Sequence, residues 1–177
     1  MKLDISEVFS LENGEIVKKV NMDMAVFQSK MGEFPIQKSK PFDIKIANLE
    51  NKRLLIQGET DVTIAIPCDR CLEDVLTPFH ITFEKELPIQ VVAAASDNTE
   101  EDESDVYMEG FYLDVDRLIY GEILVNWPAK VLCRQDCKGI CAKCGTNLNT
   151  GTCNCEQGEL DPRMAAFQDV FNKFKEV

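Results

Sequence analysis

Apolar and polar residues alternate along the middle of the chain with the period of two that is typical of β-strands. Phe42, Ile44 and Ile46 fall on one face of the first such run, and charged residues stand between them. The same alternation appears within 54–66 and again in 79–87. These runs predict half-buried antiparallel strands that follow one another as a meander.

Three further features of this region shape the prediction. A polar stretch at 48–52 predicts a turn between the first two strands. Gly58 lies inside the second run, where a glycine predicts a bulge or a bend. The mixed pattern of 16–27 fits either a strand or a short helix.

Helical spacing appears in two segments near the C-terminal end. Asp114 is a suitable N-cap for a helix that carries Leu118, Ile119 and Ile123 on one face, and Pro128 ends the segment. A second helix is predicted to begin at Asp161, where a proline follows the cap. Its apolar stripe consists of Met164, Phe167, Val170, Phe171 and Phe174. We interpret this stripe as a core face, with a groove for a partner as the alternative.

Length and composition restrict the class of protein. The chain has 177 residues, of which 45% are hydrophobic and 28% are charged, and these values are close to those of average globular domains. No apolar run approaches the roughly 20 residues that cross a bilayer. The first residues carry acids where an export signal would have an apolar core. We therefore expect a cytoplasmic protein.

Charge is distributed unevenly along the chain. Residues 1–129 contain 12 Lys and Arg against 25 Asp and Glu, whereas residues 130–177 contain 7 against 6. An acidic body repels phosphate chains, so any RNA contact is expected only in the C-terminal part. The acidic surface suits a basic protein partner, although it could serve solubility alone. The segment 96–105 contains 6 acids and no apolar residue, which predicts a mobile loop, with an acidic interaction segment as the alternative.

Six of the eight cysteines lie between Cys133 and Cys155. In a reducing compartment, closely spaced thiols act as metal ligands or redox pairs more often than as disulfides. Cys141 and Cys144 are separated by two residues and followed by Gly145, which is typical of a zinc knuckle. A structural zinc site needs four ligands, so a second pair must join them. We favour Cys153 and Cys155; the alternative pair is Cys133 and Cys137.

The remaining cysteines, Cys68 and Cys71, follow the predicted strand 54–66. They could complete a second metal site with Cys133 and Cys137. The alternative is a redox pair, but such pairs lie at the start of a helix in a parallel sheet, and the pattern here predicts antiparallel strands.

Three basic residues, Arg134, Lys138 and Lys143, stand among the cysteines. They would offset the negative charge of a tetrathiolate zinc centre, and they are the candidate RNA contacts. Nothing in the sequence indicates an enzyme. The one histidine, His80, falls on the polar face of a strand, and no phosphate loop or nucleophile motif is present. We expect neither a small-molecule substrate nor a membrane partner.

Several motifs resemble those of the YceD family, the large ribosomal RNA subunit accumulation proteins. They are VTIAIPCDRCLE at 62–73, LDVDRLIYGEILVNWPAKVLC at 113–133, CKGICAKCGTNLN at 137–149, CNC at 153–155 and DPR at 161–163. The resemblance implies a role in 23S rRNA accumulation and large-subunit biogenesis, with no catalytic activity. It also implies that Cys68 and Cys71 are the more widespread motif, and that the cluster nearer the C-terminus serves stability.

The patterns together predict an α+β protein. Its main domain, residues 1–129, has an antiparallel central sheet, for which a barrel-like form is one option, and a helix packed on it. Residues 130–177 form a Zn²⁺-binding extension that ends in a helix. The expected function is to bind a ribosomal protein or ribosomal RNA of the large subunit. Its alternative is a thiol redox or zinc-responsive protein that uses Cys68 and Cys71.

Overall fold

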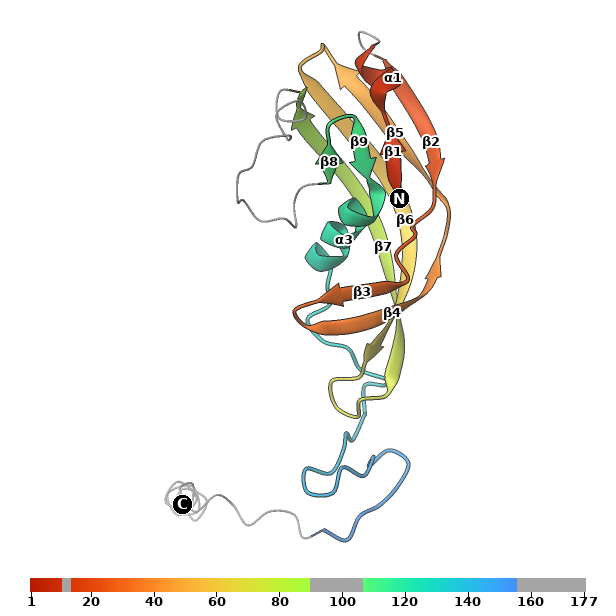
Figure 1. Ribbon diagram of the computed structural model, residues 1–177. Helices are drawn as coiled ribbons and strands as arrows, with labels where there is room; N and C mark the ends of the chain where they lie inside the picture. Colours follow the sequence, from red (N-terminus) through yellow and green to blue (C-terminus); the bar gives the residue numbers. More distant parts are fainter. Residues whose placement is uncertain (11–13, 90–106, 156–177) are drawn as a thin grey trace, which may run out of the picture.

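The computed structural model describes residues 1–10, 14–89 and 107–155, and antiparallel strands make up most of it (Figure 1). The elements are β1 (Lys2–Asp4), α1 (Ser6–Phe9), β2 (Glu15–Val20), β3 (Val26–Ser29), β4 (Gly32–Ser39), β5 (Phe42–Leu49), β6 (Arg53–Pro67), β7 (Asp74–Pro88), β8 (Met108–Glu109), β9 (Tyr112–Asp114) and α3 (Val115–Val125). The loop predicted at 96–105 and the helix predicted from Asp161 lie outside the described residues.

Strand β6 is the centre of the main sheet. Along one side it pairs with β7 over its whole length of 15 residues. Along the other side it pairs first with β5, up to Gly58, and then with β4, from Val62. Strands β2 and β3 continue the sheet beyond β5 and β4, while β1, β9 and β8 form a separate small sheet. The β6–β7 hairpin therefore joins the two halves of the sheet and projects beyond them (Figure 1).

The three runs of alternating residues are confirmed as β5, β6 and β7. The ambiguous segment 16–27 forms strand rather than helix, in β2 and the start of β3. Of the bulge or bend predicted at Gly58, the bulge is absent, because the β6–β7 register runs through the Gly58–Phe83 pair without a shift. The shift in this sheet lies instead between Ile36 and Lys38 of β4.

The predicted packed helix is confirmed as α3. The Asp114 carboxylate caps it by accepting from the backbone N–H groups of Asp116 and Arg117. Leu118, Ile119 and Ile123 are buried in the same core as the inner residues of the sheet. None of the helices among the described residues is long and apolar enough to span a membrane.

The prediction of a barrel-like sheet is wrong, because the sheet stays open. In the part of the chain that the structure describes, no pairing joins β7 to β2 or β3. The physical reason is that α3 covers the apolar face, so the sheet need not close on itself to bury it. Buried Glu122 of α3 also forms an ion pair with Lys85 of β7, with 2.6 Å between Oε1 and Nζ.

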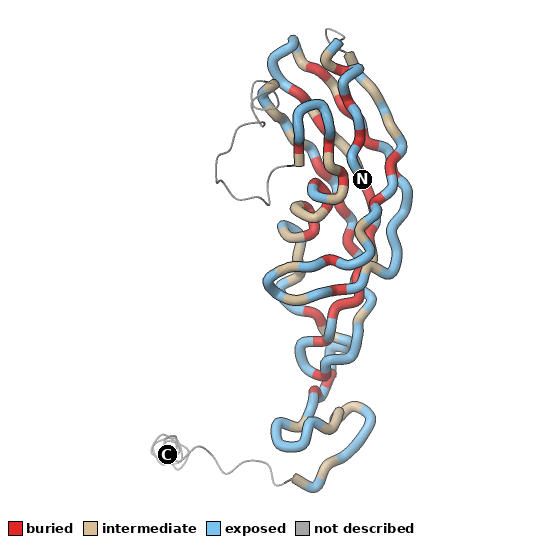
Figure 2. Tube along the Cα trace, in the orientation of Figure 1, coloured by how far each residue is buried: buried red, intermediate tan, exposed pale blue. Residues whose placement is uncertain are grey.

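Aromatic rings fasten the β3–β4 hairpin to the end of α3. The ring of Phe27 stacks on Tyr120 at 4.8 Å and on Trp127 at 5.2 Å between centroids. Trp127 also lies 4.9 Å from Phe34 and 5.8 Å from Phe79 of β7. Buried residues fill this body, whereas the segment that follows α3 becomes mostly exposed or half-buried towards residue 155 (Figure 2).

Candidate metal centres

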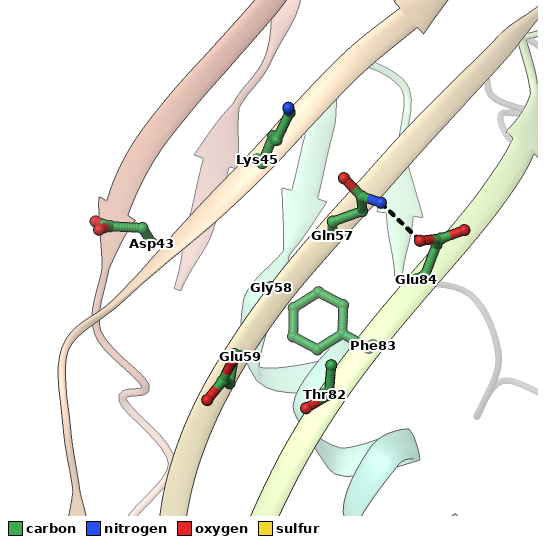
Figure 3. A pocket seen from close by; sticks show the side chains of 8 residues that line it. All are labelled: Asp43, Lys45, Gln57, Gly58, Glu59, Thr82, Phe83 and Glu84. Atoms are coloured by element: carbon green, nitrogen blue, oxygen red, sulfur yellow. Dashed lines mark hydrogen bonds between the residues drawn. The ribbon is translucent and has the colours of Figure 1, made fainter.

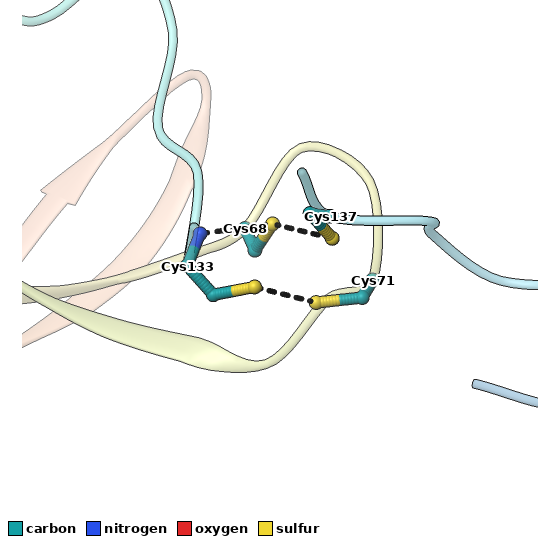
Figure 4. Close-up of side chains that lie close together, drawn as sticks. All are labelled: Cys68, Cys71, Cys133 and Cys137. Carbon is teal, nitrogen blue, oxygen red and sulfur yellow. Dashed lines mark hydrogen bonds between the residues drawn. The ribbon is translucent and has the colours of Figure 1, made fainter. Parts of the chain in front are cut away.

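Four cysteines from two distant segments meet at the tip of the β6–β7 hairpin. Cys68 and Cys71 lie in the hairpin turn, and Cys133 and Cys137 lie in the segment after α3. Their Sγ atoms all lie within 4.8 Å of one another. The Cys68–Cys137 sulfurs are 3.9 Å apart and the Cys71–Cys133 sulfurs 3.5 Å apart (Figure 4). Three of the four residues are buried, and Cys133 is exposed.

The hairpin turn is shaped so that both of its sulfurs face inward. The Cys68 N–H donates to the Glu73 carbonyl at 2.8 Å, and the Leu72 N–H donates to the Cys68 carbonyl at 2.9 Å. Leu72 adopts the left-handed conformation with φ of 62°, which costs a residue with a side chain about 1 kcal/mol or more. Such a cost persists where the surrounding contacts fix the backbone, as they do here.

Hydrogen bonds attach the segment after α3 to this turn. Asp69 and Val131 exchange two of them, from the Asp69 N–H to the Val131 carbonyl at 2.9 Å and from the Val131 N–H to the Asp69 carboxylate at 2.7 Å. The Arg70 guanidinium donates to the Cys137 carbonyl at 2.8 Å, and the Ile140 N–H donates to the Arg70 carbonyl at 3.1 Å. Gly139 permits this approach, because a Cβ there would lie 3.0 Å from the Arg70 carbonyl oxygen.

The sulfur spacing fits a tetrahedral metal ion. With zinc–sulfur bonds of about 2.3 Å, the edge of a tetrahedron of four sulfurs is about 3.8 Å. The two distances of 3.9 and 3.5 Å are close to that edge. They are much longer than the roughly 2.05 Å of a disulfide. Four thiolates are a donor set for zinc and also for iron.

The electrostatics of this first cluster favour a cation. Burial acts to raise the pKa of the Cys68 thiol, but N–H groups of Arg70, Cys133 and Cys71 outweigh it and lower that pKa to about 6. The Glu73 N–H acts to lower the pKa of Cys71, yet burial and the neighbouring thiols raise it to about 12. Without a cation, ionisation of one sulfur therefore opposes ionisation of the next. A divalent ion removes that conflict.

A second cluster lies further along the extension. The Sγ atoms of Cys141, Cys144, Cys153 and Cys155 also lie within 4.8 Å of one another, and these residues are half-buried or exposed. Gly145, with φ of 72°, closes the first turn by donating its N–H to the Cys141 carbonyl at 2.9 Å. The chain then returns through residues 146–152 to bring in the last two sulfurs. These four thiols have the same donor chemistry as the first cluster.

In this second cluster too, hydrogen bonds and neighbouring thiols lower the pKa of one sulfur and raise that of another. The Thr146 hydroxyl, 3.1 Å from the Cys144 Sγ, contributes most to lowering the pKa of Cys144 to about 6. The Cys144 thiol is in turn the main reason that the pKa of Cys155 is raised to about 12. The second cluster therefore has the same electrostatic preference for a cation.

The structure brings each predicted ligand into one of these clusters. Cys141 and Cys144 join Cys153 and Cys155, the pair favoured from the sequence, while Cys133 and Cys137 join Cys68 and Cys71. Cys68 and Cys71 occupy a hairpin turn rather than a helix start, which is not the setting of a thioredoxin-like pair.

The three basic residues of the extension differ in their surroundings. Arg134 donates from Nη2 to the Asn149 side-chain oxygen at 2.8 Å, and its Nε lies 3.5 Å from Asp136. Lys138 and Lys143 are exposed, and within the described residues no ion pair involves either of them. The lysines are thus the more accessible cations of the three.

Sequence reasoning missed the polar residues that surround the first cluster. Asn149 donates from Nδ2 to the Cys137 Sγ at 3.3 Å, and Asn147 donates from Nδ2 to Glu73 at 2.8 Å. The signal available was the pair of asparagines in the loop of residues 146–152, since asparagine side chains often hydrogen-bond nearby backbone.

A shallow hollow lies elsewhere, where β5, β6 and β7 run side by side (Figure 3). Carboxylates from Asp43, Glu59 and Glu84 line it, and Gln57 donates to Glu84 at 2.6 Å. Gly58 and Phe83 also line it, and the Phe83 ring lies against Gly58. The hollow contains no thiol, and it is separate from both cysteine clusters.

Comparison with known proteins identifies the family of this chain. The family model described as "Large ribosomal RNA subunit accumulation protein YceD" matches residues 56–171, more than half of the chain, and this range includes all eight cysteines. No solved structure gives a significant match.

Similar curated proteins are uncharacterized. One from Mycobacterium leprae is 28% identical over 106 residues, which cover 60% of this chain and 48% of that protein. YlbN of Bacillus subtilis is 25% identical over 140 residues, or 78% of each chain. One from Mycobacterium tuberculosis is 26% identical over 128 residues, 72% of this chain and 60% of that protein. The chain thus spans less than two thirds of these mycobacterial relatives. Since the family model covers most of the chain and both clusters, the protein belongs to the YceD family of large ribosomal RNA subunit accumulation proteins.

Proposed function

We propose that this protein is a non-enzymatic factor that supports accumulation of 23S rRNA, and hence biogenesis of the large ribosomal subunit, by binding a component of that subunit. The observation that carries the proposal is the family match over residues 56–171. The two cysteine clusters support a second part of the proposal, which is that zinc binds there and stabilises the extension. The described part of the extension, residues 130–155, buries little apolar surface and so has few other means of keeping a fixed form.

A basic ribosomal protein is the partner that the charge distribution favours. Residues 1–129 carry a net charge of −13, from 12 Lys and Arg against 25 Asp and Glu. Such a body attracts cationic proteins and repels the phosphates of RNA. The alternative is rRNA held by the extension, where Lys138 and Lys143 are exposed.

Deletion and complementation test the role itself. In a bacterium that carries this gene, we expect deletion to lower 23S relative to 16S rRNA and to reduce free large subunits in sedimentation profiles. The wild-type gene should restore both, and the tagged protein should co-sediment with large-subunit precursors in low salt. An unchanged rRNA ratio, with the protein confined to the unbound fraction, would contradict the proposal.

Direct binding separates the two partners. Titration of the purified protein with basic large-subunit proteins should give binding that weakens with salt and is unaffected by Lys138→Ala with Lys143→Ala. If rRNA is the partner instead, the same double substitution should reduce the slope of log affinity against log salt by about 1 for each lost phosphate contact.

A further inference from the structure

The loop that closes the second cluster also supports the first. Asn149 lies in this loop, between Cys144 and Cys153, yet its side chain contacts the first cluster. Its Nδ2 donates to the Cys137 Sγ, with 3.3 Å between nitrogen and sulfur. Its Oδ1 accepts at 2.8 Å from the Lys138 N–H and at 2.8 Å from the Arg134 guanidinium. One amide thus holds a ligand sulfur and the backbone beside it.

The same loop is attached to the first cluster by other bonds. Asn147 Nδ2 donates to the Glu73 carboxylate in the hairpin turn at 2.8 Å, and its Oδ1 accepts from the Asn149 N–H at 2.9 Å. The Leu148 N–H donates to the Gly139 carbonyl at 2.9 Å, and Ile140 forms a bridge with Asn147. These contacts fix the position from which Asn149 reaches Cys137.

The second cluster fixes the two ends of this loop. Cys144 lies just before it and Cys153 just after it, and their sulfurs are within 4.8 Å of each other. The loop itself is exposed or half-buried, so it gains little order from a core of its own. The contacts described above and the anchoring of its two ends together set its position against the first cluster.

We infer that metal binding at the second cluster strengthens metal binding at the first, and that Asn149 is the positioning residue that transmits the effect. This inference rests on the metal binding proposed above. An N–H group directed at a ligand sulfur orients the thiolate and disperses its charge, and loss of such a partner typically weakens metal binding about 10- to 100-fold. Because binding free energies are linked, metal at the first cluster strengthens binding at the second by the same factor.

The test is a zinc competition experiment on the full chain with a chromogenic chelator. Cys153→Ser with Cys155→Ser removes the second site, and we expect the zinc that remains at the first cluster to bind about 10- to 100-fold more weakly than in the wild type. Asn149→Ala should weaken first-cluster zinc to a similar degree while both ions still bind at saturation. Asn149→Asp keeps the acceptor but loses the N–H donor, so it should weaken zinc at least as much.

A double-mutant cycle and a control make the outcome decisive. In the Cys153→Ser, Cys155→Ser background, Asn149→Ala should cause little further loss, because the loop is already released. Asn154→Ala is the matched control, since Asn154 is exposed and within the described residues no hydrogen bond joins its side chain to a sulfur. Amide exchange in β6 and β7 verifies that each variant is folded.

Two results would overturn the inference. One is first-cluster affinity that is unchanged when the second site is removed, and the other is full additivity of Asn149→Ala with that removal. Both leave the proposed ribosomal role intact, whereas a chain that takes up no zinc at all removes the metal-binding part of that proposal as well.

Discussion

The pairing of Gly58 with Phe83 shows how a missing side chain makes room for a neighbouring ring. A Cβ at Gly58 would lie 2.5 Å from Cζ of Phe83, and Phe83 is only 4% exposed, so its ring has little space to move into. We expect Gly58→Ala to lower the free energy of unfolding by about 1–3 kcal/mol. Urea denaturation followed by Trp127 fluorescence measures this change.

Gly121 of α3 is the matched control for that substitution. Nothing lies within 4 Å of the position that its Cβ would take. Alanine is favoured over glycine inside a helix, so Gly121→Ala should raise stability by about 0.5–1 kcal/mol. Equal effects of the two substitutions would show that the Phe83 contact is not what makes Gly58 sensitive.

His80 gives the stability of the protein a pH dependence. Its Nδ1 lies 3.0 Å from Asp61, and this hydrogen bond, with the charge of Glu59, raises the His80 pKa above 6.5. A raised folded-state pKa adds stability that is complete below the unfolded pKa and is lost as pH rises through the folded one. The stability difference between wild type and His80→Gln should therefore shrink as pH rises from the unfolded-state pKa, about 6.5, through the higher folded-state pKa.

The same pair can be observed directly. NMR titration of the His80 ring should give a pKa above 6.5, and Asp61→Asn should move it down towards that value. Asp61 should show the reciprocal effect, since the hydrogen bond from His80 is the main cause that lowers its pKa. A His80 pKa that does not respond to Asp61→Asn would rule out this assignment.

Strands and helices were predictable where one apolar face is long and regular. The alternation in β5, β6 and β7 and the spacing in α3 each reflect a single buried face. Strand β4 carries no such signal, because Pro35 interrupts it and only Phe34 is buried along its eight residues. Gly58 does not mark a bulge. A glycine stands there because the Phe83 ring on the neighbouring strand leaves no room for a Cβ, and the local sequence does not show that contact.

The β3–β4 hairpin depends on its aromatic contacts with α3. Phe27 is fully buried and stacks on both Tyr120 and Trp127. We expect Phe27→Ala to cost about 3–5 kcal/mol and to shift the emission of Trp127, the one tryptophan, to longer wavelength. Val26→Ala is the control, since Val26 is 43% exposed on the same strand. A comparable loss in both variants would mean that the hairpin is held by something other than these rings.

The extension should lose its order before the sheet does when metal is removed. Hydrogen bonds between the hairpin turn and the segment after α3 attach it to the sheet. The N–H groups of Asp69, Val131 and Ile140 donate such bonds. We expect a strong chelator to abolish protection of these amides in hydrogen exchange. Amides in the middle of β6 and β7 should keep theirs, because the sheet has its own apolar core. Simultaneous loss of protection in both regions would contradict this separation.

Across the chain as a whole, local spacing favoured the grouping of Cys141 and Cys144 with Cys153 and Cys155, whereas the first cluster followed only by combining the four cysteines that were left. Each Cys-x-x-Cys turn is visible in the sequence, and the return of Cys153 and Cys155 to Cys141 and Cys144 spans only a short loop. Cys71 and Cys133, by contrast, are 62 positions apart. Their proximity depends on the path of β7 and α3, which no local pattern encodes. The supporting asparagines were missed for the same reason.

Metal bound at the first cluster would turn part of the covalent chain into a ring. An ion bound there would join Cys71 to Cys133, so the backbone between them would begin and end at one point. A single proteolytic cut in that stretch would then leave two fragments that stay joined by the ion as well as by the apolar core that they share. After such a cut, four sulfur atoms would replace the lost peptide bond as a link between the two fragments.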